Sequence, residues 1–126
     1  FGKIVLSWQD SLQGAELPND GHNVVIHEFA HQLDQENGTA NGAPILGKDQ
    51  TYQCWSAVFS QQFEILRKQA AAGTPSIFDY YGASEPAEFF AVVSEVFFEK
   101  SKQFSIEHPA LYQQLTNYYK VDPIHW

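Results

Sequence analysis

Residues 23–34 read NVVIHEFAHQLD and hold His27, Glu28 and His31 in the pattern H-E-x-x-H. Side chains four residues apart on a helix share one face, so the two histidines point the same way. Two imidazoles at that spacing can share one zinc ion, and Glu28 lies beside them, where its carboxylate can reach a water on the metal. The motif also occurs by chance, but it lies here in a helical pattern with a plausible third ligand on a second helix. The sequence therefore predicts a helix that carries a zinc site.

The rest of this helix divides into a polar and an apolar side. Asn23 is a good N-cap, and Ile26 and Leu33 belong to the apolar residues that would face a core. Asp34 follows His27 by seven residues and therefore stays on the histidine face. We expect Asp34 to fix the tautomer of a ligating imidazole. The alternative is that Asp34 is simply a polar residue near the helix end.

Composition limits the class of protein. The chain has 126 residues, 44% of them hydrophobic, which predicts a single domain over residues 1–126 with a core of its own. It contains no methionine, so we expect a fragment of a longer protein.

The formal net charge of −8 and the scattered basic residues argue against nucleic acid as a direct partner. Cys54 is the only cysteine, which excludes an internal disulfide and a cysteine-based zinc knuckle. No apolar run reaches the length of a membrane span and no signal peptide is visible, so we expect no membrane partner and take the cytoplasm as the default location.

Periodicity predicts the order of elements. Residues 3–8 (KIVLSW) are typical of a strand. If this strand lies at the edge of a sheet beside the metal helix, it would bind an extended peptide; the alternative is that it only packs in the core. Loops are expected over 9–20 and 37–44, and a helix over 49–72 that ends at Gly73. A further helix is expected to run to Glu99, and Ser84 is a candidate for its cap. A loop then leads to a short helix over 109–119.

Two glutamates on the helix that ends at Glu99 are candidates for the third zinc ligand. Glu88 and Glu95 lie seven residues apart on one face, among many apolar neighbours. Burial of a carboxylate in such surroundings is costly unless it is paired or bound to a metal. Spacing alone leaves open which of the two is the ligand and which orients an imidazole or faces solvent. We expect one zinc ion per chain, with the fourth position left to water.

The remaining chemistry needs a base and an oxyanion donor. Glu28 would take a proton from the zinc-activated water as it attacks a carbonyl carbon, and would pass it to the leaving amine. Tyr80 or Tyr81, just ahead of the second ligand helix, would stabilise the oxyanion, although both would ordinarily be interpreted as packing aromatics. His22 is kept as a candidate substrate contact. His108 and His125 are interpreted as surface or locally hydrogen-bonded residues.

Several motifs together resemble the Mlc titration factor A family of bacterial zinc metallopeptidases, whose catalytic core is similar to that of anthrax lethal factor. The resemblance covers nearly the whole chain. It rests on HEFAHQLD, on the run from Tyr81 to Phe98, and on the shorter matches Val5–Trp8, Ala40–Pro44, His108–Tyr112 and Asp122-Pro123.

This resemblance implies an α+β, zincin-like fold, mainly helical with a small β-sheet. It implies His27, His31 and Glu88 as zinc ligands, Glu28 as the general base and Tyr81 as the oxyanion-side tyrosine. The implied activity is that of a gluzincin-like peptidase, an aminopeptidase that cleaves peptide substrates. Family members also bind the repressor Mlc, which links them to the glucose phosphotransferase system, and they are longer than this chain. The alternative is a regulatory module that sequesters a transcriptional repressor, with the zinc site vestigial or secondary.

Overall fold

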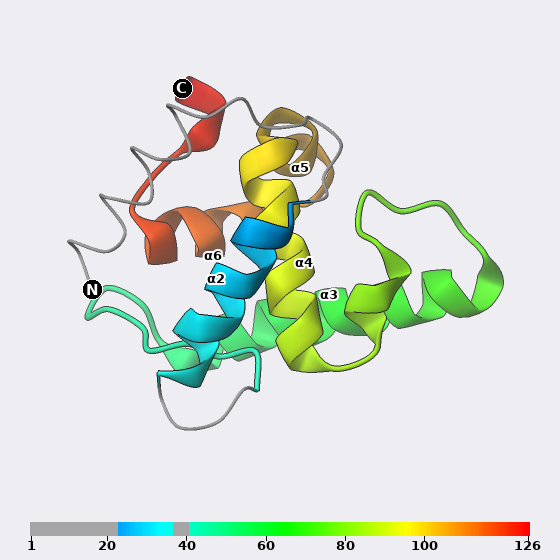
Figure 1. Cartoon of the computed structure of the whole chain (residues 1–126), viewed down its shortest axis with the longest axis horizontal. Coiled ribbons are helices and arrows are strands. Elements are labelled where there is room, and N and C mark those ends of the chain that lie inside the picture. Colours follow the sequence, from blue (N-terminus) through cyan, green and yellow to red (C-terminus); the bar gives the residue numbers. More distant parts are fainter. Residues whose placement is uncertain (1–22, 37–40) are drawn as a thin grey trace.

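Helices account for every regular element in the part of the chain that the structure describes. The computed structural model describes residues 23–36 and 41–126 (Figure 1). The elements are α2 (Val24–Gln35), α3 (Tyr52–Ala72), the 3-10 turn η1 (Tyr80–Ala83), α4 (Pro86–Glu99), α5 (Ser101–Glu107), α6 (Pro109–Tyr119) and the 3-10 turn η2 (Pro123–His125). None of the helices in these residues is long and apolar enough to cross a membrane.

The predicted α+β fold with a small β-sheet is wrong for these residues, because residues 23–36 and 41–126 contain no strand. The physical reason lies in the apolar pattern, which recurs at steps of three and four and so gives helices that cover one another. The strand expected over 3–8, the loop expected over 9–20 and His22 lie outside the described residues.

Helix α4 is the centre of the core. Its residues are buried on all sides, with Phe90, Val93 and Phe97 fully enclosed. A helix that is buried around its whole circumference needs neighbours on every side. Here α2 packs along one face, while η1, α5 and α6 contact others. Figure 1 shows α2 lying alongside α4, with α3 running below them in the view.

Aromatic rings fill the space between α3 and α4. Trp55 stacks on Phe59 with ring centroids 4.1 Å apart, and Phe59 meets Phe89 edge to face at 5.9 Å. The buried Trp55 ring also donates its Nε1 hydrogen to the Gly42 carbonyl at 3.0 Å. This bond ties the loop after α2 to the core and leaves no unpaired indole N–H.

Local signals set most helix ends. Asn23 caps α2 as predicted, and its side chain accepts from Ile26 N at 3.1 Å. Helix α3 ends at Gly73, which adopts the left-handed conformation with φ of 70°. Helix α6 begins at Pro109 and ends at Tyr119, the expected limits.

Two predictions between these helices are wrong. Ser84 does not cap α4: the capping position is Glu85, without a side-chain cap bond, and the Ser84 hydroxyl donates to the Tyr81 carbonyl at 2.8 Å. The loop expected before residue 109 contains helix α5, which buries Phe104 completely. A seven-residue helix is too short to show a period, and tertiary burial of one aromatic ring stabilises it.

Candidate metal centre

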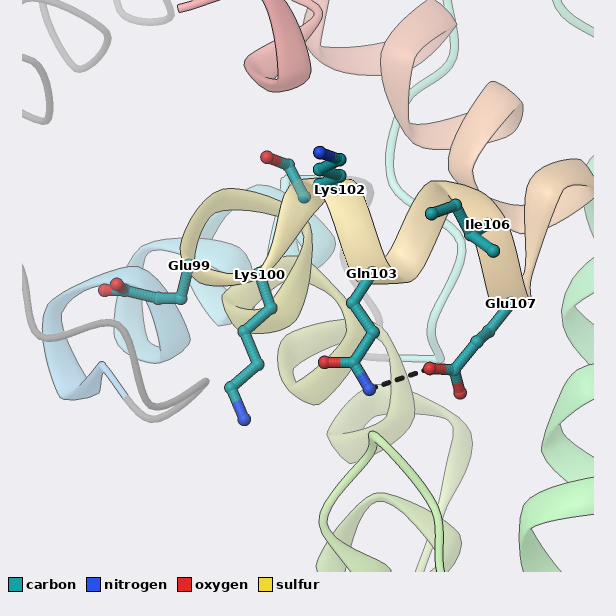
Figure 2. A pocket seen from close by; sticks show the side chains of 7 residues that line it. Glu99, Lys100, Lys102, Gln103, Ile106 and Glu107 are labelled. Carbon is teal, nitrogen blue, oxygen red and sulfur yellow. Dashed lines mark hydrogen bonds between the residues drawn. The ribbon is translucent and has the colours of Figure 1, made fainter.

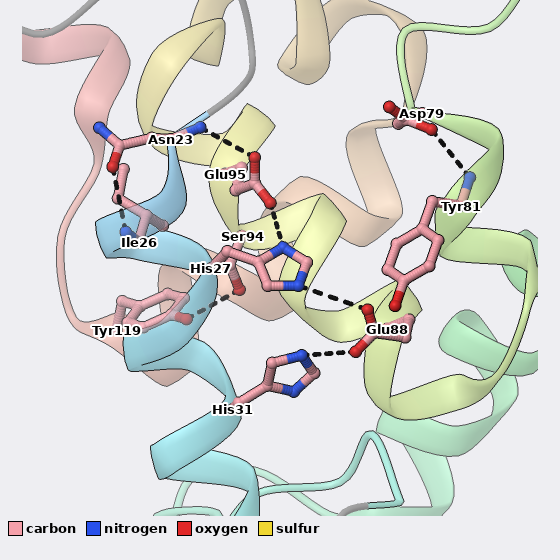
Figure 3. Close-up of polar contacts among 10 residues, drawn as sticks. All are labelled: Asn23, Ile26, His27, His31, Asp79, Tyr81, Glu88, Ser94, Glu95 and Tyr119. Carbon is pink, nitrogen blue, oxygen red and sulfur yellow. Dashed lines mark hydrogen bonds and ion pairs between the residues drawn. The ribbon is translucent and has the colours of Figure 1, made fainter.

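Helices α2 and α4 pack in opposite directions and bring two polar stripes together. The stripe on α2 consists of residues at four-residue steps, Asn23, His27 and His31, and the stripe on α4 consists of Glu99, Glu95 and Glu88. The start of α2 meets the end of α4, because Asn23 Nδ2 donates to Glu99 Oε1 at 2.7 Å. Toward the other end, His31 Nε2 lies 2.5 Å from Glu88 Oε1. Figure 3 shows Asn23, His27 and His31 of the first stripe facing Glu95 and Glu88 of the second.

His27, His31 and Glu88 form a cluster with the donor set of a metal site. One ligand atom from each of the three lies within 4.8 Å of the others. His27 Nε2 lies 3.4 Å from Glu88 Oε2, and the two imidazole rings meet nearly edge to face with centroids 4.8 Å apart. All three side chains are largely shielded from solvent, at 19%, 19% and 11% exposure. Two imidazole nitrogens and one carboxylate are the donors that a catalytic zinc ion prefers.

The hydrogen bonding around His27 supports a cation at this position. Its Nδ1 atom faces Glu95 Oε1 while its Nε2 atom faces Glu88. A neutral imidazole has a single N–H, so only one of these carboxylates can receive a proton from it. Glu88 Oε2 is in fact buried without a hydrogen-bond partner. A cation among the two Nε2 atoms and Glu88 would pair every one of these groups, so the residues present fit a bound metal.

Glu95 occupies the position of an orienting carboxylate. His27 Nδ1 lies against Glu95 Oε1, and the tautomer that carries its hydrogen on Nδ1 donates to this carboxylate and leaves Nε2 free to point toward Glu88. The second oxygen of Glu95 accepts from Asn23 N at 2.9 Å. A carboxylate behind a ligating imidazole fixes the tautomer and the ring orientation. In this structure Glu88 faces both histidines, whereas Glu95 faces only the far side of His27.

Turn η1 places Tyr81 over the cluster and directs Tyr80 elsewhere. The Asp79 side chain accepts from Tyr81 N at 2.9 Å, and Gly82 packs so closely on Val92 that an added Cβ would lie 3.1 Å from the Val92 Cβ. The Tyr81 ring lies 6.4 Å from that of His27. Hydrogen bonding to Glu88 and its negative charge raise the pKa of Tyr81, which keeps the phenol protonated and able to donate. The Tyr80 hydroxyl instead donates to the carbonyl of Thr74.

A cavity of about 370 Å³ opens beside the cluster. Its lining includes Glu28, Tyr81 and the ring of His27, together with Asp79 and Val24. Glu28 is exposed to solvent, one residue round the helix from His27. The predicted base and the predicted tyrosine therefore share one cavity with the imidazole of His27.

Asp34 has a different set of partners from those expected. Its carboxylate accepts from Gly42 N at 2.8 Å and from Asn41 N at 3.3 Å, and it thereby fastens the loop after α2. Burial raises the pKa of Asp34, although these backbone donors act in the opposite sense. Asp34 is fully buried, and its carboxylate holds the loop that packs against the start of α4.

A larger hollow, of about 740 Å³, lies where α4 passes into α5. Figure 2 shows Lys100, Lys102 and Ile106 around it, with Gln103 donating to Glu107 at 2.7 Å. None of its lining residues belongs to the His27, His31 and Glu88 cluster. It mixes both signs of charge and offers no converging ligand set, so the smaller cavity is the candidate active site.

His108 and His125 lie away from this centre. His108 is half-buried, with Nδ1 2.9 Å from Gln62 Oε1 and its ring 4.8 Å from that of Phe78. Burial lowers the pKa of His108. His125 is exposed near Asp122 at 3.6 Å. Both agree with the interpretation as local hydrogen-bonding or surface residues.

Sequence reasoning missed two features of the centre, the second role of Asn23 and the contribution of Glu99. The available signal was the spacing of Glu88, Glu95 and Glu99, which lie along one side of a helix. Three carboxylates on a strongly apolar helix call for polar partners. The partner of Glu99 is Asn23, which the sequence had indicated only as the cap of α2.

Comparison with known proteins shows the family to which this chain belongs. Residues 1–120 match a family model described as glucose-regulated metallo-peptidase M90, and the chain belongs to that family. A protein of Synechocystis sp. (strain ATCC 27184 / PCC 6803 / Kazusa), named as uncharacterized, is 44% identical over 123 residues, which are 98% of this chain and 45% of the relative.

Relatives named Mlc titration factor A are also similar to the chain. The one from Edwardsiella ictaluri (strain 93-146) is 35% identical over 130 residues, covering 98% of this chain and 47% of the relative. The one from Escherichia coli O17:K52:H18 is 36% identical, again over 98% of this chain, and covers 46% of the relative. The chain thus spans about half the length of the curated relatives that it matches.

Proposed function

We propose that this protein is a zinc-dependent peptidase that removes residues from the amino end of peptides. The observation that carries the proposal is the convergence of ligand atoms from His27, His31 and Glu88 within 4.8 Å, beside a cavity that also holds Glu28 and Tyr81. Membership in a metallopeptidase family supports it. A structural zinc site has no need of a base or of an open cavity at the metal.

In this proposal His27, His31 and Glu88 hold one zinc ion. When bound, the ion supplies Lewis acidity, which polarises the substrate carbonyl and lowers the pKa of a water molecule. Glu28 accepts the proton of that water as its oxygen attacks the carbonyl carbon, and then gives the proton to the departing amine nitrogen as the C–N bond breaks. Tyr81 donates a hydrogen bond from its phenol O–H to the carbonyl oxygen as that oxygen becomes negative. Glu95 keeps the ring of His27 in place throughout.

The charge of the cavity supports cleavage at a free amino end. Glu28, Asp79 and Glu95 line it, and no lysine or arginine is among the described residues around it. A divalent metal ion offsets Glu88 and one further carboxylate, so the lining stays negative on balance, which favours a positively charged group on the substrate. The α-ammonium group of a peptide supplies that charge next to the bond to be cleaved.

The test compares the zinc-loaded protein with Glu28→Gln on aminoacyl reporters that carry either a free or an acetylated amino group. We expect the parent to cleave the free-amine reporters and to lose the reaction on acetylation. Glu28→Gln should retain zinc and lower turnover by about 10²- to 10⁴-fold, the usual contribution of a general base. Glu64→Gln removes an exposed carboxylate on α3 and is the matched control, with parent turnover expected.

Two results would count against the proposal, one against the amino-end preference and the other against the peptidase activity. Equal cleavage of acetylated reporters would remove the amino-end preference and leave a peptidase of another specificity. Zinc binding without cleavage of any reporter would favour the second candidate function, a regulatory module that sequesters an Mlc-like transcriptional repressor.

The second candidate rests on the relatives that carry the name Mlc titration factor A. It requires a location in the cytoplasm, which stays a prediction. The chain spans about half of those relatives, so repressor binding has to be measured on this chain itself. Titration calorimetry with purified Mlc-like repressor, using parent and Glu28→Gln, would separate binding from catalysis. Binding that is equal in both variants would support the sequestering role.

A further inference from the structure

Asn23 caps α2 and also makes two hydrogen bonds that join the start of α2 to the end of α4. Its side-chain Oδ1 accepts from Ile26 N at 3.1 Å, which is the helix cap. Its backbone N–H donates to Glu95 Oε2 at 2.9 Å, and its side-chain Nδ2 donates to Glu99 Oε1 at 2.7 Å. One residue therefore satisfies carboxylates on two successive turns of α4.

The two glutamates need such a donor. Glu95 and Glu99 are four residues apart on one helix face, and each is only 7% exposed. Like charges at that spacing repel each other, and burial strengthens the repulsion. Asn23 donates its backbone N–H to Glu95 and its Nδ2 hydrogen to Glu99, and these two bonds hold the carboxylates in fixed positions.

From Glu95 the connection continues to the candidate metal site. One oxygen of Glu95 accepts from Asn23, and the other faces His27 Nδ1. The orientation of the His27 ring, and with it the position of Nε2, depends on where this carboxylate lies. Figure 3 shows Asn23, Glu95, His27 and Glu88 in one continuous line of contacts.

We propose that Asn23 is a positioning residue of the metal centre, which holds Glu95 against His27 through its anchorage to Glu99. This inference rests on the proposed zinc site. A cap alone does not require asparagine, because serine and aspartate cap helices equally well. Asparagine uses two separate atoms, Oδ1 for the cap and Nδ2 for Glu99, whereas serine has a single hydroxyl oxygen and aspartate would bring a third negative charge.

The decisive variant is Asn23→Ser, which retains a capping oxygen and the backbone N–H but removes the Nδ2 donor. We expect its zinc dissociation constant, measured by competition with a chromophoric chelator, to rise about tenfold, the low end for outer contacts of metal ligands. Asn23→Asp should raise it further. The Co²⁺-loaded variants should also show a changed d–d absorption spectrum.

Thr51→Ala is the matched control. Thr51 caps α3 by accepting from Cys54 N at 3.1 Å, and it has no contact with the cluster. Its loss should lower the melting temperature and leave zinc affinity and the Co²⁺ spectrum unchanged. Parent zinc affinity in both Asn23→Ser and Asn23→Asp would overturn the proposal.

A double-mutant cycle with Glu99→Ala tests the anchorage. If Asn23 acts through Glu99, each single variant should weaken zinc binding, and the double variant should be no weaker than the worse single one. Effects that multiply in the double variant would show two independent contributions and would overturn the proposed route.

A metal-free measurement separates this inference from the proposed function. The Nδ1 proton of His27 can be followed by NMR in the zinc-free protein and assigned by its loss in His27→Gln. We expect slow exchange with solvent in the parent and in Thr51→Ala, and at least tenfold faster exchange in Asn23→Ser, because a loosened carboxylate protects the proton less. Should the parent bind no zinc, the proposed function fails while this exchange rate still decides the role of Asn23. Equal exchange in parent and Asn23→Ser would refute it.

Discussion

Replacing Gly42 by alanine should destabilise the protein and weaken its metal site. Gly42 lies in the loop after α2 with φ of 80°, a conformation that residues with a side chain rarely adopt. A Cβ atom there would lie 2.6 Å from the carbonyl oxygen of Pro86 and 2.9 Å from its carbonyl carbon. Both are backbone atoms of the first turn of α4, so the added methyl group can be accommodated only if that turn moves.

The expected loss follows from these two terms. A left-handed backbone costs an L-residue about 1–2 kcal/mol. Displacement of packed backbone by an added methyl group costs about 1–3 kcal/mol. The free energy of unfolding should therefore fall by about 2–5 kcal/mol, a large part of the stability of an ordinary domain. Because Glu88 follows Pro86 by two residues, the same movement should raise the zinc dissociation constant.

Gly73→Ala is the control that isolates the steric term. Gly73 has a similar φ of 70°, but an added Cβ there would meet nothing within 4 Å. This variant should lose only about 1–2 kcal/mol and keep parent zinc affinity. Urea unfolding followed by circular dichroism, with a common slope, gives both values. Equal losses in the two variants would refute the argument that the approach of Gly42 to Pro86 sets the position of α4.

Three further predictions concern the site and the core. Glu88→Gln should weaken zinc binding more than Glu95→Gln in chelator competition, because Glu88 faces both histidines; the reverse order would make Glu95 the ligand. Tyr81→Phe should lower turnover by about 10²-fold, as loss of one oxyanion donor does, with zinc content unchanged; parent turnover would return Tyr81 to the packing aromatics. Burial lowers the pKa of His108 in the folded protein, so the unfolded chain binds a proton more readily, and the free energy of unfolding should fall as the pH drops below about 6.5. His108→Gln should flatten this dependence in urea unfolding between pH 7.5 and 5.5, and an unchanged slope in that variant would contradict the assignment.

The sequence predicted the helices that have long apolar stripes and clear stop signals. Helix α6 begins at Pro109 and ends at Tyr119 because proline suits a first turn and because Lys120, which follows, adopts the left-handed conformation that ends a helix. The seven-residue spacing of Glu88 and Glu95 likewise placed both on the face that now meets α2. These features depend on local geometry alone, which is why a single sequence suffices for them.

Tertiary packing decides the features that the sequence did not predict. Helix α5 forms around Phe104, whose ring packs against Phe78 at 5.2 Å and against Phe97 at 6.3 Å. Both partners come from other elements, so no pattern within 101–107 reveals the contact. The choice of Glu85 rather than Ser84 at the start of α4 has a similar cause, since the Ser84 hydroxyl is used by turn η1.

The roles of Glu88 and Glu95 depend on the direction in which α2 and α4 pack. In a parallel arrangement the start of α2 would lie beside Glu88, and Glu95 would approach His31. In the structure the helices are antiparallel, so Glu88 reaches both imidazoles and Glu95 reaches only His27. Contacts at both ends maintain this register. At one end, the side chain of Asn23 donates a hydrogen bond to Glu99. At the other end the loop fastened by Asp34 sets Gly42 against Pro86. Slippage by one turn would change which carboxylate faces the histidines, so these two contacts keep Glu88, rather than Glu95, opposite both imidazoles.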